Sequence, residues 1–326
     1  MRSFGRVLGR LLLLVIVVGV TAFAFGPREP LDLVPEFDAA RLPDDLDAYL
    51  AAREDVVGGI TPGTEKRIVW AGEPGHKTGW AVVCLHGFSA TSEEIRPVPD
   101  DVARTLKANL YFARFAGHGI GSERFAGPSA QDWMIDVAEA LAIGRRIGER
   151  VLVISTSTGG TLAAEAALQP ELAAKMDGIV FISPNFGIAS PAARLLTWPF
   201  ARSWVSVVAG VERCFEPMNE RHQRFWTTCY PTEALLPLAA VTKHAAGQDY
   251  SGVRIPALFL FSGADRVVQA DATKVVAAGW GGPVTVSLQE VGQGDDPYSH
   301  VIAGDILSPS RTAPVTAAIL DWASGL

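Results

Sequence analysis

From residue 66 to the C-terminus, short apolar runs alternate with longer segments whose apolar residues recur at helical spacing. The apolar runs have the length of strands that are buried on both faces of a sheet. They are RIVWAG (67–72), WAVVCLHGF (80–88), NLYFARFAG (109–117), RVLVIS (150–155), GIVFIS (178–183), ALFLFSG (257–263) and VTVSLQEV (284–291). The helical segments are residues 129–148, 161–175, 270–280 and 313–326. The alternation predicts an α/β fold, a mainly parallel sheet with helices on both faces.

Two intervals interrupt this alternation and predict how the chain is organised. Residues 185–254 contain several aromatic residues but no clear core strand, so we expect a helical cap over the sheet edge where ligands bind. Residues 27–65 are rich in proline, aspartate and glycine, and the pattern DDLDAYLAARE (44–54) predicts one short helix there. This segment is interpreted as an N-terminal tether. The α/β core is then expected to comprise residues 66–184 and 255–326.

The N-terminus has the charge order of an export signal. Arg2, Arg6 and Arg10 precede the uncharged apolar stretch LLLLVIVVGVTAFAFG, and such a sequence directs a chain to a membrane. The stretch is short for a relaxed membrane span, and its AFA motif is an A-x-A-like cleavage site. Residues 1–26 are therefore predicted to be a signal peptide or an N-terminal membrane anchor. The alternative, a buried first helix, fits the three arginines poorly. We expect the protein to be exported or membrane-anchored, in a bacterial periplasm or cell envelope.

Composition narrows the class of protein. The chain has 326 residues, 48% of them hydrophobic and 19% charged, which describes a folded protein with one large domain or a domain with an insertion. The net charge is −7, and no lysine and arginine cluster lies beyond the N-terminus, so nucleic acid is not an expected partner.

The chain has three cysteines. Cys84 lies in an apolar strand. Cys214 and Cys229 either form a disulfide in an oxidising compartment or remain two buried thiols.

The segment VLVISTSTGG (151–160) passes from an apolar strand into hydroxyl and glycine residues. A serine becomes a nucleophile where a base removes its proton and a sharp strand-to-helix turn exposes it, with small residues two positions away on each side. With Ser157 at the apex, these flanking residues are Ser155 and Gly159. With Ser155 at the apex, one flank would be Val153, whose branched side chain fits the crowded turn poorly. Ser157 is therefore the predicted nucleophile.

A histidine later in the chain must serve as the base for Ser157. His222, His244 and His300 are the histidines that follow it. The first two lie in the predicted cap. His300 lies in GQGDDPYSHV, a polar, glycine-rich loop after the last predicted strand, from which a side chain can reach over the sheet edge. His300 is therefore the predicted general base.

An acid is also needed, because it fixes the histidine tautomer and stabilises the imidazolium that forms during the reaction. Asp265 follows the strand ALFLFSG, so its carboxylate should emerge at the same edge of the sheet as His300. Asp271, Asp295 and Asp296 are weaker candidates, since they lie in a helix or beside the histidine itself. Asp265 is the predicted orienting acid.

Backbone N–H groups should stabilise the oxyanion that forms during acyl transfer. Thr158 opens the helix after Ser157, where the first amides have no acceptor within the helix, so its N–H is one predicted donor. Gly87 allows the chain to turn after an earlier strand, so the N–H of Phe88 is the second, and the Phe88 ring is expected to line the acyl pocket. His86 is expected to make structural hydrogen bonds.

His86 and His118, both beside glycines, also raise the hypothesis of a metal site. However, the sequence has no H-x-x-x-H pattern, and no carboxylate lies at ligand spacing from either histidine. We therefore expect no metal.

Five motifs occur in the order found in the α/β-hydrolase superfamily, which the chain resembles from about residue 66 to its end. They are LHGFSA (85–90), FAGHGIGSE (115–123), STSTGG (155–160), SGADRVV (262–268) and SHV (299–301). Within the superfamily the chain is similar to the monoacylglycerol lipase and bacterial carboxylesterase branch, which has HGF at the oxyanion loop, a GHG turn and a helical cap. It departs from the usual G-x-S-x-G motif at Ser155, which replaces a glycine.

The resemblance implies an α/β-hydrolase fold with an eight-stranded, mainly parallel sheet and no cofactor. Its functional residues are then Ser157 as nucleophile, His300 as base, Asp265 as orienting acid, and Phe88 and Thr158 as oxyanion donors.

These residues together predict a serine hydrolase that cleaves carboxylic esters through an acyl-enzyme. The expected partner is a small-molecule ester with an apolar acyl chain, and residues 7–26 offer a means of membrane association. Two alternatives stay open: a peptidase or acyltransferase with the same triad, and a non-catalytic protein that binds a hydrophobic ligand beneath the cap.

Overall fold

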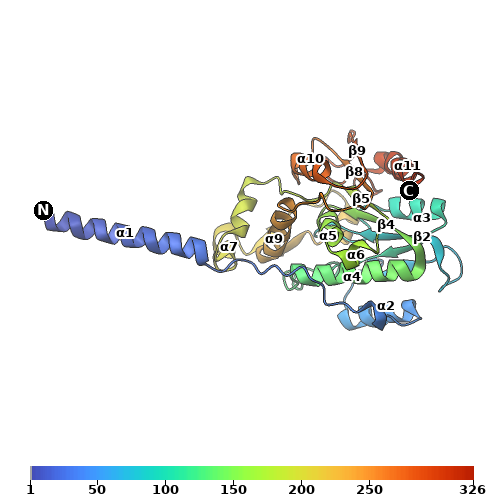
Figure 1. Cartoon of the computed structure of the whole chain (residues 1–326), viewed down its shortest axis with the longest axis horizontal. Helices are drawn as coiled ribbons and strands as arrows, with labels where there is room; N and C mark the ends of the chain where they lie inside the picture. Colours follow the sequence, from blue (N-terminus) through green and yellow to red (C-terminus); the bar gives the residue numbers. More distant parts are fainter. Residues whose placement is uncertain (1) are drawn as a thin grey trace.

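A seven-stranded sheet forms the centre of the computed structural model, which describes residues 2–326 (Figure 1). Its strands are β1 (Arg67–Val69), β2 (Thr78–Leu85), β3 (Asn109–Phe112), β4 (Gly148–Thr156), β5 (Gly178–Ile182), β8 (Ala257–Phe261) and β9 (Val284–Leu288). They lie in the order β1-β3-β2-β4-β5-β8-β9. Neighbouring strands are parallel except for β1, which is antiparallel to β3.

The α/β-hydrolase fold and its mainly parallel sheet are confirmed, and the seven strands coincide with the seven apolar runs of the sequence. The expected total of eight strands is wrong for the described residues, which form seven in the main sheet. Within residues 2–326, the chain ahead of β1 forms helices, among them α2 (Leu46–Val57), and irregular segments, and no strand pairs with the outer side of β1.

Helices cover both faces of the sheet, as the sequence pattern predicts. They are α3 (Val98–Leu106), α4 (Ala130–Ile147), α5 (Thr158–Ala167), α6 (Pro170–Ala173), α9 (Leu235–Ala246), α10 (Ala270–Gly279) and α11 (Thr312–Ala323). Val83 and Val153 pack in one core with α4 and α5, whereas their neighbours Val82 and Leu152 pack in another with α3 and α11. This alternation follows from the period of two in a strand. Helix α3 was not predicted, because its nine residues include five that are polar or charged or are proline.

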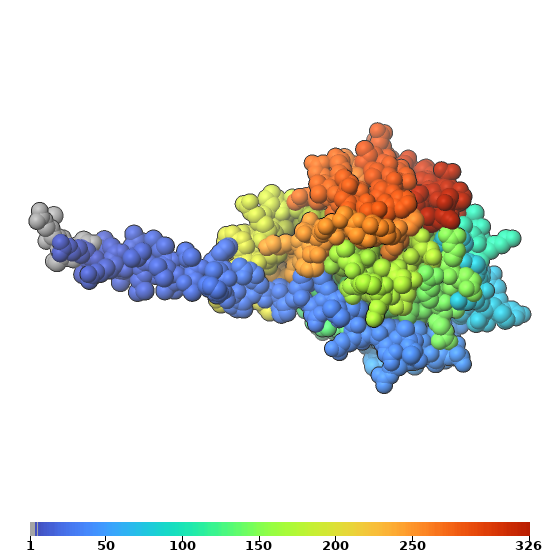
Figure 2. All heavy atoms as spheres, viewed as in Figure 1, coloured from blue at the N-terminus to red at the C-terminus, as the bar shows by residue number. Residues whose placement is uncertain are grey.

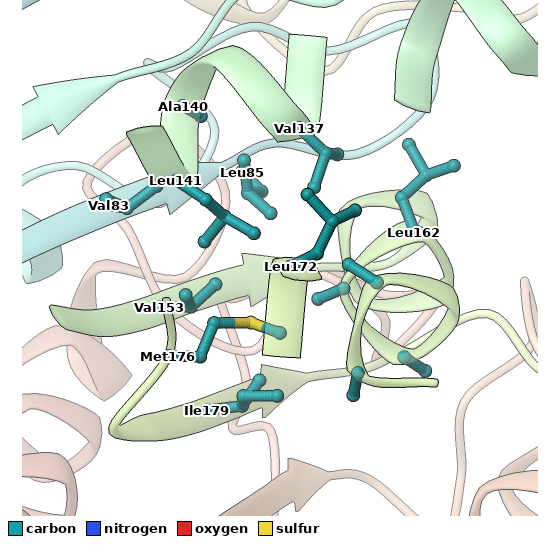
Figure 3. Packing of buried hydrophobic residues seen from close by; sticks show 14 of the residues in the cluster. Val83, Leu85, Val137, Ala140, Leu141, Val153, Leu162, Leu172, Met176 and Ile179 are labelled. Carbon is teal, nitrogen blue, oxygen red and sulfur yellow. The ribbon is translucent and has the colours of Figure 1, made fainter. Parts of the chain in front are cut away.

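The core on the α4 side fixes the middle strands of the sheet. Val83, Val153 and Ile179 come from three neighbouring strands, and they face Leu141 of α4 and Leu162 of α5 (Figure 3). All five side chains are fully buried. Since such interiors are packed as densely as organic crystals, the carboxyl ends of β2, β4 and β5 are held rigidly relative to one another.

Helix α1 (Arg2–Phe25) extends away from the rest of the molecule (Figure 1, Figure 2). Its segment Arg6–Phe25 has 20 residues, a mean hydropathy of 2.5 and no buried residues. That length is sufficient to cross the hydrocarbon core of a bilayer, although a signal sequence has the same character. Residue 1 of the predicted signal or anchor segment lies outside the described residues.

Helix α2 lies within the segment predicted as a tether, and buried ion pairs fix both α2 and the residue before β1 to the core. Lys66, which precedes β1, contacts Asp136 at 2.6 Å and Glu139 at 2.5 Å, both on α4. Arg114 contacts Glu54 of α2 at 2.7 Å. These charges are paired and almost fully buried, so loss of one partner would leave an uncompensated charge in the interior.

Residues 185–254 are mainly helical but include a short hairpin that the sequence did not predict. Besides α9, they form the 3₁₀ helix η2 (Pro191–Thr197), α7 (Ala201–Ala209), α8 (Glu220–Phe225), and the strands β6 (Glu212–Cys214) and β7 (Cys229–Pro231). The amide of Thr227 donates to the carbonyl of Ser89 at 2.7 Å, so this segment contacts the loop after β2. Three-residue strands are too short to show a periodic pattern in a sequence.

Cys214 and Cys229 form a disulfide between the two strands of this hairpin, which resolves the alternative left open by the sequence. Cys84 is a buried free cysteine in β2.

Replacement of both Cys214 and Cys229 by serine is expected to lower the free energy of unfolding by about 3 kcal/mol, because the bridge restricts a 15-residue separation in the unfolded chain. Thermal unfolding of the wild type and the variant, each with and without dithiothreitol, measures the effect. The reductant should lower the Tm of the wild type towards that of the variant and leave the variant unchanged. An equal effect of the reductant on both proteins would contradict the prediction.

Candidate active site

Ser157 lies in the sharp turn between β4 and α5. Its backbone angles are φ 51° and ψ −115°, a combination that costs a non-glycine residue of the order of 1–3 kcal/mol. The turn is held by hydrogen bonds, since the Ser157 amide donates to the Ile182 carbonyl at 3.0 Å and the Ser157 carbonyl accepts from the Asn185 amide at 3.0 Å. The hydroxyl therefore stands at a strained position that its surroundings fix.

Gly159 makes this turn possible because the start of α5 approaches the end of β2 very closely. A Cβ atom at Gly159 would lie 2.3 Å from the Leu85 carbonyl oxygen and 2.7 Å from that of His86. Both atoms belong to the backbone and cannot move away as a side chain could. A side chain at position 159 is thus excluded by contact rather than by backbone conformation.

Ser155, which replaces the usual glycine of the motif, has a different environment. Its side chain is fully buried, and its hydroxyl donates to the Val180 carbonyl of β5 at 2.9 Å. The added hydroxymethyl group is thereby accommodated between two strands, with its polar atom paired. The Ser155 hydroxyl therefore points between the strands and does not reach the sheet edge where Ser157 lies.

His300 connects Ser157 with Asp265. The distance from His300 Nε2 to Ser157 Oγ is 3.1 Å, and the distance from His300 Nδ1 to Asp265 Oδ2 is 2.8 Å. Because the Asp265 carboxylate can only accept a hydrogen bond, the ring proton of neutral His300 is assigned to Nδ1. Nε2 then has a free lone pair that can accept the proton of the Ser157 hydroxyl. The three residues predicted from the sequence are therefore brought together, from the ends of β4 and β8 and the loop after β9.

Asp265 is oriented by the backbone that follows it. Its Oδ1 accepts hydrogen bonds from the amides of Val267 at 2.8 Å and Val268 at 2.9 Å, while Oδ2 faces His300. One carboxylate oxygen is thus held by the loop, and the other is left for the imidazole.

The three alternative acids have other partners. Asp271 pairs with Lys274 at 2.8 Å on α10, and Asp295 accepts from the Ser310 amide at 3.2 Å. Asp296 accepts from the amides of His300 and Val301, both at 2.9 Å, so it fixes the backbone of the loop that carries the histidine.

Burial and charge act in opposite directions on His300. Burial by itself lowers the pKa of the imidazole, because it disfavours the charged form, but the Asp265 carboxylate raises it through charge and a hydrogen bond. Glu94 and Asp296 add to this effect, and the net result is a pKa raised above the ordinary value. The site therefore supports an imidazolium despite its burial.

The amides of Phe88 and Thr158 both lie beside Ser157. Thr158 is the first residue of α5, and Phe88 follows Gly87, where an added Cβ would lie 3.1 Å from the Ser157 Cβ. Within residues 2–326, neither amide donates to a protein acceptor. Two unpaired N–H groups next to a hydroxyl are able to bind a developing oxyanion.

The ring of Phe88 packs into an aromatic cluster rather than standing free in an open pocket. Its centroid lies 4.9 Å from Phe125, 5.4 Å from Tyr230 and 5.8 Å from His118. Tyr230 belongs to β7, so the cluster joins the loop after β2 to residues 185–254. The expectation that this ring lines an acyl pocket stays a prediction.

His86 has the structural environment expected from the sequence. Its Nδ1 contacts the Gly87 carbonyl at 2.8 Å, its Nε2 accepts from the Phe115 amide at 3.1 Å, and burial lowers its pKa to about 4. Burial also lowers the pKa of His118 well below its ordinary value. Both imidazoles are therefore neutral near pH 7.

Glu94, which was not predicted from the sequence, lies in the loop between β2 and α3. Its side chain is buried, and its Oε2 accepts from the Gly87 amide at 2.7 Å. A buried glutamate is uncommon unless it has a partner, yet its position in a polar stretch gave no periodic signal. The signal that could have indicated it is the acidic residue seven positions after Gly87 of the HGF motif.

This arrangement of sheet, turn and polar residues defines an α/β hydrolase, and the chain belongs to the alpha/beta hydrolase family. The model of that family matches residues 82–303, which include Phe88, Ser157, Thr158, Asp265 and His300. The superfamily resemblance drawn from the motifs is thereby confirmed. No curated protein matches the chain by sequence.

Solved structures of lipases and esterases are similar to this chain. One comes from work on LipS and LipT, two metagenome-derived lipolytic enzymes; it is 20% identical, with a TM-score of 0.66, and covers 82% of this chain and 100% of its own. A monoacylglycerol lipase from Paleococcus ferrophilus is 14% identical, with a TM-score of 0.55, and covers 79% and 98%. A soluble variant of monoglyceride lipase from Saccharomyces cerevisiae is 10% identical, with a TM-score of 0.57, and covers 79% and 89%. At these identities the likeness establishes a common fold.

Replacing Gly159 by alanine is expected to destabilise the protein by about 1–3 kcal/mol, because the new Cβ would collide with two backbone carbonyls at the end of β2. Denaturant unfolding monitored by circular dichroism measures the change. Gly263→Ala is the matched control, since no atom lies within 4 Å of a Cβ at that position. Equal stability of the two variants would contradict the close approach described here.

Proposed function

We propose that the chain is a serine hydrolase that cleaves carboxylic esters through an acyl-enzyme on Ser157. The observation that carries this proposal is the continuous hydrogen-bonded series from Asp265 through His300 to Ser157, with distances of 2.8 Å and 3.1 Å. The series lies at the end of a strained strand-to-helix turn, which is where an acyl-transfer nucleophile is exposed in this family of folds.

In the first half of the reaction, Ser157 Oγ attacks the ester carbonyl carbon while His300 Nε2 takes the hydroxyl proton. The carbonyl π electrons move onto the oxygen, and the Phe88 and Thr158 amides hydrogen-bond that oxyanion. When the tetrahedral intermediate collapses, the bond to the leaving alkoxy oxygen breaks, and His300 returns the proton to the departing alcohol.

In the second half, water replaces the alcohol. His300 takes a proton from the water as its oxygen attacks the acyl carbon, and the proton then passes to Ser157 Oγ as the carboxylic acid leaves. Asp265 keeps its negative charge throughout and stabilises the imidazolium in each tetrahedral intermediate. The base form of His300 is neutral, so activity is expected to decline as the pH falls through its raised pKa.

The substrate is proposed to be an ester with an apolar acyl chain. Aromatic side chains surround the loop that carries Phe88, and α1 would bring the enzyme to a membrane. The lipolytic and monoacylglycerol lipase relatives support the same substrate class, since they share the fold over most of this chain.

The proposed location is outside the cytoplasm, with α1 retained as an anchor or removed as a signal. The disulfide between Cys214 and Cys229 supports this location, because such bonds persist in oxidising compartments.

Ser157→Ala is expected to reduce kcat for p-nitrophenyl esters by about 10⁴-fold or more, since loss of a triad nucleophile removes covalent catalysis. Ser155→Ala is the matched control: it removes a hydroxyl two residues away that bonds to the Val180 carbonyl, so its kcat should stay within about tenfold of the wild type. A panel of acyl chain lengths from acetyl to palmitoyl should show a preference for apolar chains.

Peptide amides and acceptor alcohols in the same panel test the peptidase and acyltransferase alternatives. If peptide amides are cleaved faster than esters, the peptidase alternative replaces the ester hydrolase proposal. If acyl transfer to an alcohol is faster than hydrolysis, the acyltransferase alternative replaces it. An unchanged rate for Ser157→Ala would overturn the role of Ser157. A wild-type rate no higher than the uncatalysed background would favour a ligand-binding protein.

A further inference from the structure

A cavity of about 680 Å³ lies between the C-terminal end of α1, the 3₁₀ helix η2 and helix α9. Its walls are largely apolar and include the aromatic rings of Phe23 and Trp198. Arg28, Arg194 and Lys243 also line it, whereas none of its lining residues is acidic. Three cations thus gather at one apolar cavity of a chain whose net charge is −7.

None of the three cations has an acidic partner among the described residues. Arg28 donates to the Phe23 carbonyl at 3.0 Å, and Lys243 contacts the Thr197 hydroxyl at 3.3 Å, both of which are neutral groups. In the part of the chain that the structure describes, neither these two side chains nor Arg194 forms an ion pair with a carboxylate. The positive charge at this cavity is therefore available to an anion.

The acid next to Arg28 in the sequence, Glu29, is already occupied. Its carboxylate pairs with Arg202 of α7 at 2.5 Å. This ion pair also ties the chain that leaves α1 to residues 185–254. It therefore fixes the segment after α1 without neutralising the three cations.

The cavity lies where α1 meets the rest of the molecule. The Phe23 ring packs edge-on against Trp198 with centroids 5.4 Å apart, and the Phe200 amide donates to the Pro27 carbonyl at 2.7 Å. Helix α7, which carries Val207 and Val208 with exposed fractions of 84% and 72%, lies beside the end of α1 (Figure 1). Exposed aromatic and aliphatic side chains at the end of a membrane span are typical of the bilayer interface.

We propose that this cavity binds the phosphate-bearing headgroup of an anionic phospholipid in the membrane that α1 enters. The inference rests on the proposed retention of α1 as an anchor. Arg28, Arg194 and Lys243 hold the phosphate, while Phe23 and Trp198 contact the glycerol and the first acyl carbons. A lipid bound there would fix the position of residues 185–254 relative to the bilayer and turn the molecule in one orientation towards membrane esters.

Isothermal titration of the full-length protein in neutral detergent tests the site, with dihexanoyl phosphatidylglycerol, dihexanoyl phosphatidylcholine and inorganic phosphate as probes. A Ser157→Ala background prevents hydrolysis of the lipid, so the result does not depend on the proposed esterase activity. We expect saturable binding of phosphatidylglycerol and at least tenfold weaker binding of the other two probes. The variant R28Q/R194Q/K243Q should bind phosphatidylglycerol at least about tenfold more weakly.

The control variant K77Q/K107Q/K175Q also removes three positive charges, but from the α/β domain and not from the residues that line the cavity. It should bind phosphatidylglycerol within twofold of the Ser157→Ala protein. Thermal unfolding checks that both variants fold. Equal binding of the two lipids, or undiminished binding by R28Q/R194Q/K243Q, would overturn the proposal. Inorganic phosphate that binds as tightly as phosphatidylglycerol would also overturn it, by showing a site for soluble anions.

A second inference rests on a separate observation, the carboxyl group of Glu94. An added Cβ at Gly87 would lie 2.8 Å from Glu94 Oε1 and 3.1 Å from Ser157 Cβ, so the carboxyl group and the nucleophile flank the same peptide. The other oxygen, Oε2, accepts from the Gly87 amide, which directly precedes the predicted oxyanion donor Phe88. Only 3% of Glu94 is exposed.

The charges around Glu94 belong to the site itself. The charge of His300 acts on Glu94, Asp265 and Asp296 in turn act on the imidazole, and His86 is neutral. Burial raises the pKa of Glu94 to about 7, although the Gly87 hydrogen bond and the charge of His300 both oppose that rise. Glu94 in turn raises the pKa of His300.

We infer that Glu94 is a positioning residue with two effects: it holds the Gly87 peptide so that the Phe88 amide faces the oxyanion, and its charge favours the imidazolium of His300. This inference rests on the proposed ester hydrolysis. A wild type without esterase activity would refute that function, whereas an active wild type with unaffected Glu94 variants would refute this inference alone.

The pH profiles of kcat and kcat/KM for Glu94→Gln and Glu94→Ala test it. The side-chain amide in E94Q keeps a carbonyl oxygen as an acceptor for the Gly87 amide, so this variant should retain kcat within about tenfold. Its neutral side chain no longer favours the imidazolium, so the acidic limb of kcat/KM should move to lower pH. E94A leaves the Gly87 amide without that acceptor, and its kcat should fall at least tenfold below that of E94Q with little change in KM.

Thermal unfolding of both variants shows whether each is folded under the assay conditions. An acidic limb that stays at the wild-type pH in E94Q would overturn the electrostatic effect. Equal kcat values for E94A and E94Q would overturn the positioning of the oxyanion loop. A purely structural glutamate would change Tm without moving the limb.

Discussion

The close approach of α5 to the end of β2 is the contact on which the site depends. Because Gly159 has no side chain, the first turn of α5 lies against the carbonyls of Leu85 and His86. The same contact places the start of α5, with the Thr158 amide, near the loop that carries Phe88. The absent Cβ at Gly159 therefore allows both predicted oxyanion donors to lie close to Ser157.

The electrostatics of the site follow from burial. Ser157 and His300 are both buried, in surroundings where an isolated imidazolium would be strongly disfavoured. Asp265 offsets that cost because its two oxygens are divided between the loop amides and the imidazole ring. Asp265, His300 and Ser157 thus form one hydrogen-bonded unit, and backbone hydrogen bonds hold Asp265 and the Ser157 turn in place.

The insertion at residues 185–254 relates this site to the N-terminal helix. Its β7 end contributes Tyr230 to the aromatic cluster around Phe88, and its η2 and α7 end contacts the last turn of α1. The Cys214–Cys229 disulfide closes the hairpin between these two ends.

The apolar pattern alone determined the seven strands, most of the helices that cover them, and the edge at which polar residues gather. These features depend on local periodicity and on the burial of strands, and both can be recognised from the order of neighbouring residues. Motif order and side-chain size were sufficient to select Ser157, Asp265 and His300 among their neighbours, residues that the fold then brings within hydrogen-bonding distance. The eighth strand came from the resemblance and not from the pattern, and it is absent from the described sheet.

Tertiary structure alone decided the partner of Ser155, the role of Asp296 in the histidine loop, the disulfide, the hairpin of residues 212–231 and the position of Glu94. None of these has a periodic signal, because each depends on contacts between residues far apart in sequence or on strands of only three residues. The cationic cavity at the end of α1 is the clearest case. Its outermost cations, Arg28 and Lys243, are 215 positions apart in the sequence, and the three meet only because the segment after α1 packs against η2 and α9.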